Sequence, residues 1–196
     1  MFARYIGALF ALILFSEPVF AKGQKFLSFN LGLALAQTSR EDSEGDNTVD
    51  KQVINFHGGF FPFGGLIVGL RHYQSTTTSS TTTILTGSTK QTESTTYVTS
   101  GSGIHVGYYA QSGFIIGGSY LFNPTYKSEG TEHFGGSATV LDAGWIWEVG
   151  DFGFGAQLTH STFIFKKSKV NGVETEFTKD EKFIDILPMG FATLFF

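Results

Sequence analysis

The residues that could do chemistry in this chain are a few histidines, serines and carboxylates within an aromatic, glycine-rich sequence. His160 and Ser161 are adjacent, and such residues form the nucleophile–base half of a hydrolase site when they meet. In a strand, however, adjacent side chains point to opposite faces, so these two cannot meet without a bulge. No serine, histidine and carboxylate share one face at one height, as a catalytic triad requires. The sequence therefore predicts that the protein is not an enzyme.

Metal and cofactor sites are equally poorly supported. His57 and His105 are expected on one inner surface at similar heights, but a third convincing zinc ligand is absent. The acidic segment 38–51 echoes a calcium-binding loop without its ligand spacing. We interpret it as a solvated charge run, with a weak divalent-cation site that bridges to lipopolysaccharide as the alternative. The absence of cysteine excludes thiolate chemistry and disulfides. No cofactor and no metal are predicted.

The first residues have the pattern of an export signal. Arg4 precedes an apolar stretch at 6–15, and Val19-Phe20-Ala21 suits cleavage after Ala21. The stretch is about ten residues long, well below the roughly 18 that span a bilayer as a helix. We therefore expect a cleaved signal peptide at 1–21 and one domain at 22–196. A retained anchor or a buried helix is the alternative.

Composition limits the class of this domain. The chain has 22 Phe and 25 Gly but only 4 Pro, and its formal net charge is −4. That charge gives no reason to expect nucleic-acid binding. Abundant Phe and Gly with no cysteine suit a barrel that is apolar outside and lined by small or polar residues.

Alternating side chains support this barrel. In 26–37, bulky residues such as Leu31 and Leu33 alternate with small or polar ones such as Asn30 and Gly32. Transmembrane strands need this period of two over about 9–11 residues. A soluble calycin-like barrel is the alternative. The eight strands are predicted at 26–37, 52–61, 65–74, 101–110, 113–123, 137–149, 152–162 and 183–196.

The connections between these segments alternate in length. Tight turns are predicted at 62–64, 110–112 and 150–151, and long segments at 38–51, 75–100, 124–136 and 166–182. The fold class is therefore all-β: an eight-stranded antiparallel up-and-down transmembrane β-barrel with four long extracellular loops and three short periplasmic turns. A two-residue turn at Gly150-Asp151 pairs Val149 with Phe152 and Trp147 with Phe154.

Two of the long segments are expected to form hairpins. Residues 75–100 are mostly serine and threonine, and a protruding hairpin with its tip at 84–88 is favoured over disorder or a glycosylated stalk. In 166–182, Asn171-Gly172 is a strong hairpin turn and sets Lys169 opposite Glu174 and Lys167 opposite Glu176. Such hairpins expose strand edges to which a partner could add a strand.

The last strand gives conflicting signals. If the register of the Asn171-Gly172 hairpin continues along the strand, then Leu187, Met189 and Phe191 face outward. An amphipathic strand that ends at Phe196 instead requires Leu194 and Phe196 to face outward. A bulge near Pro188 is predicted to reconcile the two parities.

Polar residues assigned to the interior are expected to plug it. Arg71 and Asp142 lie about seven residues above their turns and could meet across the lumen, since an inward arginine needs a carboxylate. An eight-stranded interior is just wide enough for side chains to fill it. A narrow conduit is the alternative. The predicted plug consists of Arg71, Asp142, Glu148, His57, His105 and Gln157, joined by Asn30, Asn55 and Tyr109.

Aromatic residues gather near the predicted periplasmic turns, as an interfacial girdle requires. The girdle is assigned to Phe60, Tyr108, Phe114, Trp145, Trp147 and Phe152.

With eight strands, four long loops and Phe196 at its end, the sequence over 22–196 resembles the small bacterial outer-membrane barrels of the OmpX and OmpA-transmembrane type, and more distantly OmpW. The resemblance implies an outer-membrane location, contact with membrane lipid and lipopolysaccharide, and recognition of Phe196 by the barrel-assembly machinery. A monomer is expected. The favoured function is a non-enzymatic surface protein that displays its loops for surface interaction, including with an extracellular protein partner, or for envelope integrity. The alternatives are a narrow channel for small or apolar solutes and, less favoured, an envelope lipid hydrolase using His160 and Ser161.

Overall fold

The computed structural model describes residues 25–42, 45–85 and 89–196, which fold almost entirely into antiparallel strands. No helix among these residues is long and apolar enough to cross a membrane. The expected signal peptide at 1–21 lies outside the described residues. The strands of the described part are β1 (Leu27–Asp42), β2 (Gly45–Phe63), β3 (Leu66–Leu85), β4 (Thr89–Tyr109), β5 (Phe114–Ser128), β6 (Thr131–Phe134), β7 (Ser137–Val149), β8 (Phe152–Val170) and β9 (Val173–Phe195).

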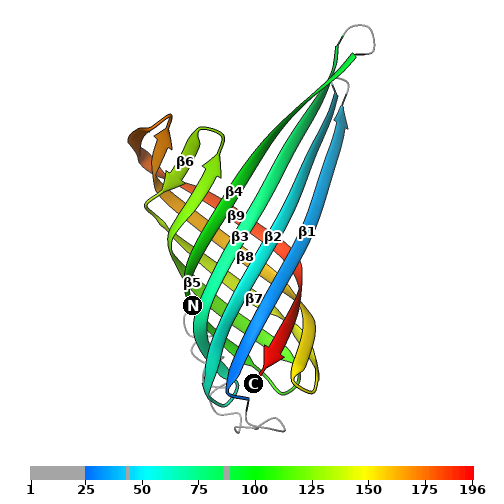
Figure 1. Ribbon diagram of the computed structural model, residues 1–196, viewed down its shortest axis with the longest axis vertical. Helices are drawn as coiled ribbons and strands as arrows, with labels where there is room; N and C mark the ends of the chain where they lie inside the picture. Colours follow the sequence, from blue (N-terminus) through cyan, green and yellow to red (C-terminus); the bar gives the residue numbers. More distant parts are fainter. Residues whose placement is uncertain (1–24, 43–44, 86–88) are drawn as a thin grey trace, which may run out of the picture.

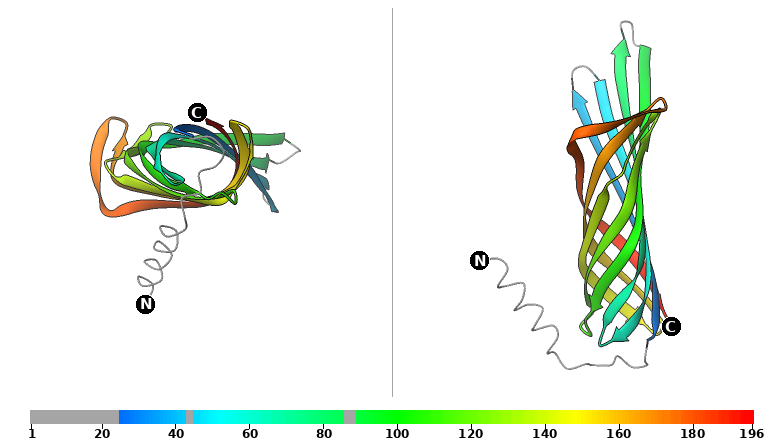
Figure 2. Two further views of the ribbon diagram at one scale, coloured as in Figure 1. Left: turned by 90° about the horizontal axis from the view of Figure 1, so that it is seen from below. Right: turned by 90° about the vertical axis from the view of Figure 1, so that its left-hand side faces the viewer.

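These strands close into a ring. Sequential neighbours pair from β1 to β5, β7 pairs with both β5 and β8, and β9 pairs with both β8 and β1. The predicted all-β antiparallel ring of eight strands is confirmed, and Figure 2 shows it along the axis. We call the end with the tight turns and Phe196 the turn end, and the opposite end the hairpin end (Figure 1).

The ninth strand, β6, lies in line with β7 and is separated from it by a short interruption. Tyr126 pairs with His133 and Phe122 with Ser137, so the register between β5 and the two strands is unbroken. The interruption falls at Gly135-Gly136, where Gly135 has a φ of 71°. Segment 124–136, predicted to be one long loop, therefore contains the end of β5, a turn and β6.

The two faces of the ring differ as the alternation predicted. On the outer face large apolar side chains are exposed, for example Leu33 (53%), Leu70 (70%) and Leu141 (54%). On the inner face Ser28 and Asn30 are fully buried. Most of the outward apolar side chains lie in the half of the ring nearer the turn end, which we call the apolar belt, whereas Val170 and Val173 are exposed at the tip of the β8–β9 hairpin. Exposed apolar surface of this extent marks a membrane or protein interaction surface.

Two of the three predicted turns are placed as expected. The Gly150-Asp151 turn pairs Val149 with Phe152 and Trp147 with Phe154, as predicted. The prediction of a turn at 62–64 was displaced, because β2 runs to Phe63 and the chain reverses at Gly64-Gly65. Both glycines have positive φ (49° and 79°), which glycine adopts without strain.

The prediction of a bulge near Pro188 was wrong. The β8–β9 register is continuous from Phe152↔Leu194 to Phe165↔Glu181 and shifts only between Phe165 and Lys167. Beyond the shift, Lys167 pairs with Glu176 across the Asn171-Gly172 hairpin, as predicted. Because the face switches near the hairpin end, the side chains expected outward, Leu187, Met189 and Phe191, are instead buried in the lumen.

Strands β1 to β4 extend well beyond the ring at the hairpin end (Figure 1). Segment 38–51, predicted to be a solvated loop, is largely a hairpin with pairs such as Thr38↔Val49. Residues 75–85 and 89–100 continue β3 and β4 as paired strands up to Leu85↔Thr89. The outward hydroxyls on these strands form rungs at Thr78–Thr96 (3.3 Å), Ser80–Ser94 (2.9 Å) and Thr82–Thr92 (2.9 Å).

The extended part of β1–β4 is a four-stranded sheet with two free edges, which we call the projecting sheet. β1 pairs with β9 only from Ser28↔Phe195 to Leu33↔Gly190. Pro188 follows just above this seam, and proline has no N–H to continue a strand ladder. On the other side, β4 pairs with β5 no farther than Val98↔Lys127. Both edges of the projecting sheet are therefore without a neighbouring strand in the described residues.

Candidate functional site

The centre of the lumen holds a buried ion pair between Arg71 of β3 and Asp142 of β7. Their side chains are 0% and 5% exposed, and Arg71 donates through both terminal nitrogens, with Nη2 lying 3.1 Å from Asp142 Oδ1. Asp142 Oδ1 also accepts hydrogen bonds from Gln157 Nε2 (3.0 Å) and Thr159 Oγ1 (2.7 Å). The strands that carry the pair are not neighbours, so it bridges the lumen from wall to wall.

The other hydrogen bonds of Arg71 extend this network towards β2 and β5, and from β5 to β4. Nε donates to Asn55 Oδ1 (2.7 Å), and Nη1 also contacts Ser119 Oγ (3.3 Å). Ser119 Oγ in turn lies 2.9 Å from His105 Nδ1, and the rings of His105 and His57 are 4.4 Å apart. A guanidinium needs several acceptors when it is removed from water, and this network supplies them. We call these residues the lumen network: Arg71, Asp142, Asn55, His57, His105, Ser119, Gln157 and Thr159.

Three predicted plug residues lie outside the lumen network. Glu148 is 37% exposed and pairs with Lys25 at the turn end, so it is not part of the lumen network. It occupies an inward position so close to the turn that its carboxylate reaches solvent. Tyr109 packs below the network against Phe61 and Phe195. Asn30 is buried and donates to Thr193 Oγ1 (2.8 Å).

Apolar clusters lie in the lumen on both sides of the network. The turn-end cluster is built on Ile115, Ile146, Phe191 and Phe195. A larger cluster lies towards the hairpin end. Its buried members are Ala34, Val53, Tyr73, Leu121, Ala138, Val140, Phe163, Phe165, Leu187 and Met189. The charged layer therefore lies between two apolar clusters.

The residues assigned to the girdle point outward near the turn end. Trp145 and Trp147 are 41% and 50% exposed, and the Trp147 ring lies 5.9 Å from that of Phe154 on the neighbouring strand. Tyr108 is half-buried. The other members, Phe60, Phe114 and Phe152, are exposed.

The structure separates the residues considered for catalysis. Ser161 is buried in the lumen, 3.5 Å from the Tyr73 hydroxyl, whereas His160 is on the outer face opposite Leu141 and Ile186. Within the described ranges, no three histidine or carboxylate side chains are grouped to hold a metal ion. His57 and His105 lie beside the Arg71 guanidinium, whose charge disfavours a cation there.

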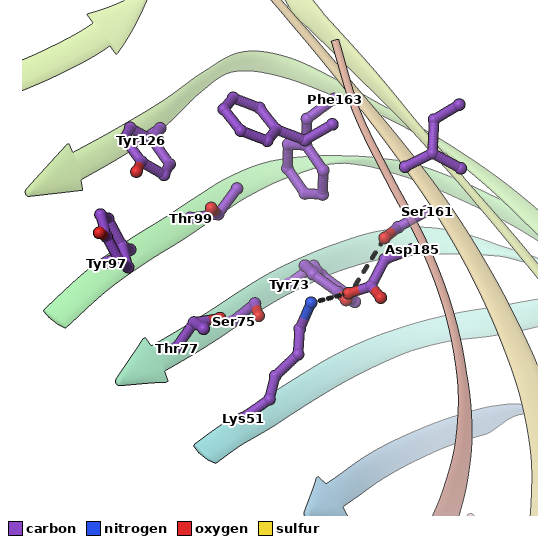
Figure 3. Close-up of a pocket in the computed structure, with 12 residues that line it drawn as sticks. Lys51, Tyr73, Ser75, Thr77, Tyr97, Thr99, Tyr126, Ser161, Phe163 and Asp185 are labelled. Atoms are coloured by element: carbon purple, nitrogen blue, oxygen red, sulfur yellow. Dashed lines mark hydrogen bonds and ion pairs between the residues drawn. The ribbon is translucent and has the colours of Figure 1, made fainter. Parts of the chain in front are cut away.

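A second inward feature, which sequence reasoning missed, is a pocket at the hairpin end with a cavity volume of about 220 Å³ (Figure 3). Six strands line it, from Lys51 of β2 to Asp185 of β9, and these two side chains form an ion pair. Tyr97 and Tyr126 contribute aromatic rings, and burial is the main reason that the pKa of Tyr126 is raised. The pocket was missed because half of its lining residues fall in segments predicted to be loops. The alternation of Tyr97, Thr99 and Gly101 continues that of the strand predicted at 101–110 and could have indicated the pocket residues on β4.

No known protein family and no curated protein matches this sequence.

Proposed function

We propose that this protein is a non-enzymatic β-barrel of the bacterial outer membrane, and that its closed barrel anchors the projecting sheet at the cell surface. The observation that carries the proposal is the layering of the lumen. The Arg71–Asp142 layer lies between two apolar clusters, and this arrangement favours a packed core over a pore. A ring stabilised in this way serves as a rigid support.

The outer surface supports the membrane location. Exposed large hydrophobics such as Leu31, Leu70 and Leu158 encircle the ring at the turn end. In water, an apolar surface that surrounds a whole protein would drive aggregation, whereas lipid covers it at no cost. Trp145 and Trp147 lie at the edge of the belt, where amphipathic rings favour the headgroup boundary.

The projecting sheet supports a role in surface interaction. Its β3–β4 part carries hydroxyls on both faces, such as the Thr82–Thr92 rung on the outer face. Its free edges at β1 and β4 present unpaired backbone groups above the belt. Such edges bind an extended segment of another protein by strand addition, so an extracellular protein is the expected partner.

The proposal predicts the orientation of the chain, and the natural absence of cysteine allows a direct test. Thr81 is exposed near the tip of the projecting sheet, and Gln111 is exposed in the turn between β4 and β5. On intact cells, a membrane-impermeant maleimide should label Thr81→Cys, and Gln111→Cys only after the outer membrane is permeabilised. Equal labelling of both variants on intact cells, or labelling of neither, would overturn the proposed location and orientation.

A further inference from the structure

The pocket at the hairpin end (Figure 3) has two kinds of wall. One is aromatic: the ring of Tyr126 stacks with Tyr97 (5.8 Å, 23°) and with Phe183 (5.1 Å, 11°). The floor adds Tyr73 and Phe163, whose ring centroids are 5.6 Å apart. Aromatic walls of this kind offer flat apolar faces to a ligand.

The other wall carries hydroxyl groups. Ser75 and Thr77 on β3 and Thr99 on β4 point into the pocket at alternate strand positions. Within the described part of the chain, none of the three forms a hydrogen bond with another side chain, in contrast to the outward rungs Thr78–Thr96 and Ser80–Ser94. Their hydroxyls are therefore not committed to another side chain.

Charge in the pocket is already balanced. Lys51 and Asp185 pair with each other across its rim, and their side chains are 24% and 28% exposed. A charged ligand would have to break this pair or bind beside a counter-charge that is already satisfied. A neutral ligand keeps the pair and can still exchange hydrogen bonds with its outer atoms.

Size sets the last limit. A cavity of about 220 Å³ corresponds to roughly seven waters at ~30 Å³ each. That is room for one substituted six-membered ring, and the open mouth allows a further ring to continue outside. A pyranose ring matches such a pocket, because the sugar has a flat apolar face and hydroxyl groups at its edge.

We propose that this pocket is a binding site for a single neutral pyranose ring, either as a free sugar or as the terminal residue of a glycan. The aromatic wall contacts the face of the sugar, and Ser75, Thr77 and Thr99 bind its hydroxyls. The site goes beyond the anchoring role proposed above and does not depend on it, because its walls belong to the folded barrel itself.

Saturation-transfer NMR on the refolded protein tests the site with four probes, the methyl pyranosides of glucose, galactose, mannose and N-acetylglucosamine. A ligand of this size is expected to bind with a Kd of about 1 mM. At least one probe should bind saturably. Absence of saturable binding by all four, or stronger binding by benzyl alcohol than by every sugar, would overturn the proposal.

Matched variants locate the binding. Thr99→Phe fills the pocket and should weaken binding at least tenfold, whereas Ser102→Phe adds the same ring to the outer face of β4 and should change nothing. Tyr126→Leu should weaken binding similarly, with the outward Tyr120→Leu as its control. Heat-dependent gel migration verifies that each variant is folded. Binding that survives both Thr99→Phe and Tyr126→Leu in folded protein would overturn the assignment to this pocket.

A separate arm of the experiment distinguishes a free sugar from the terminal residue of a glycan. An oligosaccharide that ends in the binding sugar should bind more tightly than the methyl glycoside if the site takes the end of a glycan. Equal or weaker binding of the oligosaccharide identifies a free sugar as the ligand. Either result supports a pyranose site.

Discussion

Replacing Arg71 with methionine is expected to lower the free energy of unfolding by about 3–5 kcal/mol, the range for removing one partner of a buried ion pair. The variant leaves the Asp142 carboxylate in the lumen with only Gln157 and Thr159 as hydrogen-bond donors. It also removes the donors to Asn55 and Ser119. Urea unfolding of the protein refolded into lipid vesicles measures the loss.

Two comparisons separate the buried charge from a simple loss of packing. The double variant Arg71→Met, Asp142→Leu removes both charges and should recover most of the stability, because apolar replacements of buried pairs are often neutral. Lys167→Gln breaks an exposed pair with Glu176 and should cost no more than about 1 kcal/mol. If the double variant were no more stable than Arg71→Met alone, the loss in that variant would not come from leaving the Asp142 carboxylate buried without its partner.

Substituting alanine for Gly103 is expected to destabilise the ring by about 3 kcal/mol, at the upper end of the cost of overpacking a core. A Cβ at this position would lie 1.8 Å from the backbone oxygen of Tyr120 on β5. Neighbouring backbone cannot move away as a flexible side chain can, so the β4–β5 pairing near Leu121 must shift. Urea unfolding and heat-dependent gel migration measure the effect.

Gly190 supplies the control for this substitution. It also lies in a strand, but a Cβ there would meet nothing within 4 Å. Gly190→Ala should therefore change stability by no more than about 0.5 kcal/mol. Comparable losses at both positions would mean that the cost at Gly103 does not come from close approach of the strands.

Much of the ring could be predicted because one face of each strand is large and apolar. The period of two locates such strands and fixes their parity, as the pairing of Trp147 with Phe154 illustrates. The turn at Asn171-Gly172 could be predicted because few sequences adopt two consecutive positive φ angles, here 51° and 87°. The meeting of Arg71 with Asp142 followed from the need of a buried charge for a partner.

The remainder could not be predicted because the apolar signal ends before the strands do. Beyond the belt both faces are polar, so strand pairing such as Gln37↔Asp50 leaves no periodic pattern. Bulges are decided by local backbone geometry: Asn123, with a φ of 44°, lies where the β4–β5 register shifts, opposite Gly101. Glu148 was misassigned because parity gives the face of a residue but not its distance from solvent.

The most direct test of the closed barrel is single-channel recording of the refolded protein in a planar bilayer. The lumen network and its two apolar clusters predict no discrete openings at neutral pH. Steady openings whose conductance changes in Arg71→Met would place a conducting path through the network, and would contradict the anchor that we propose.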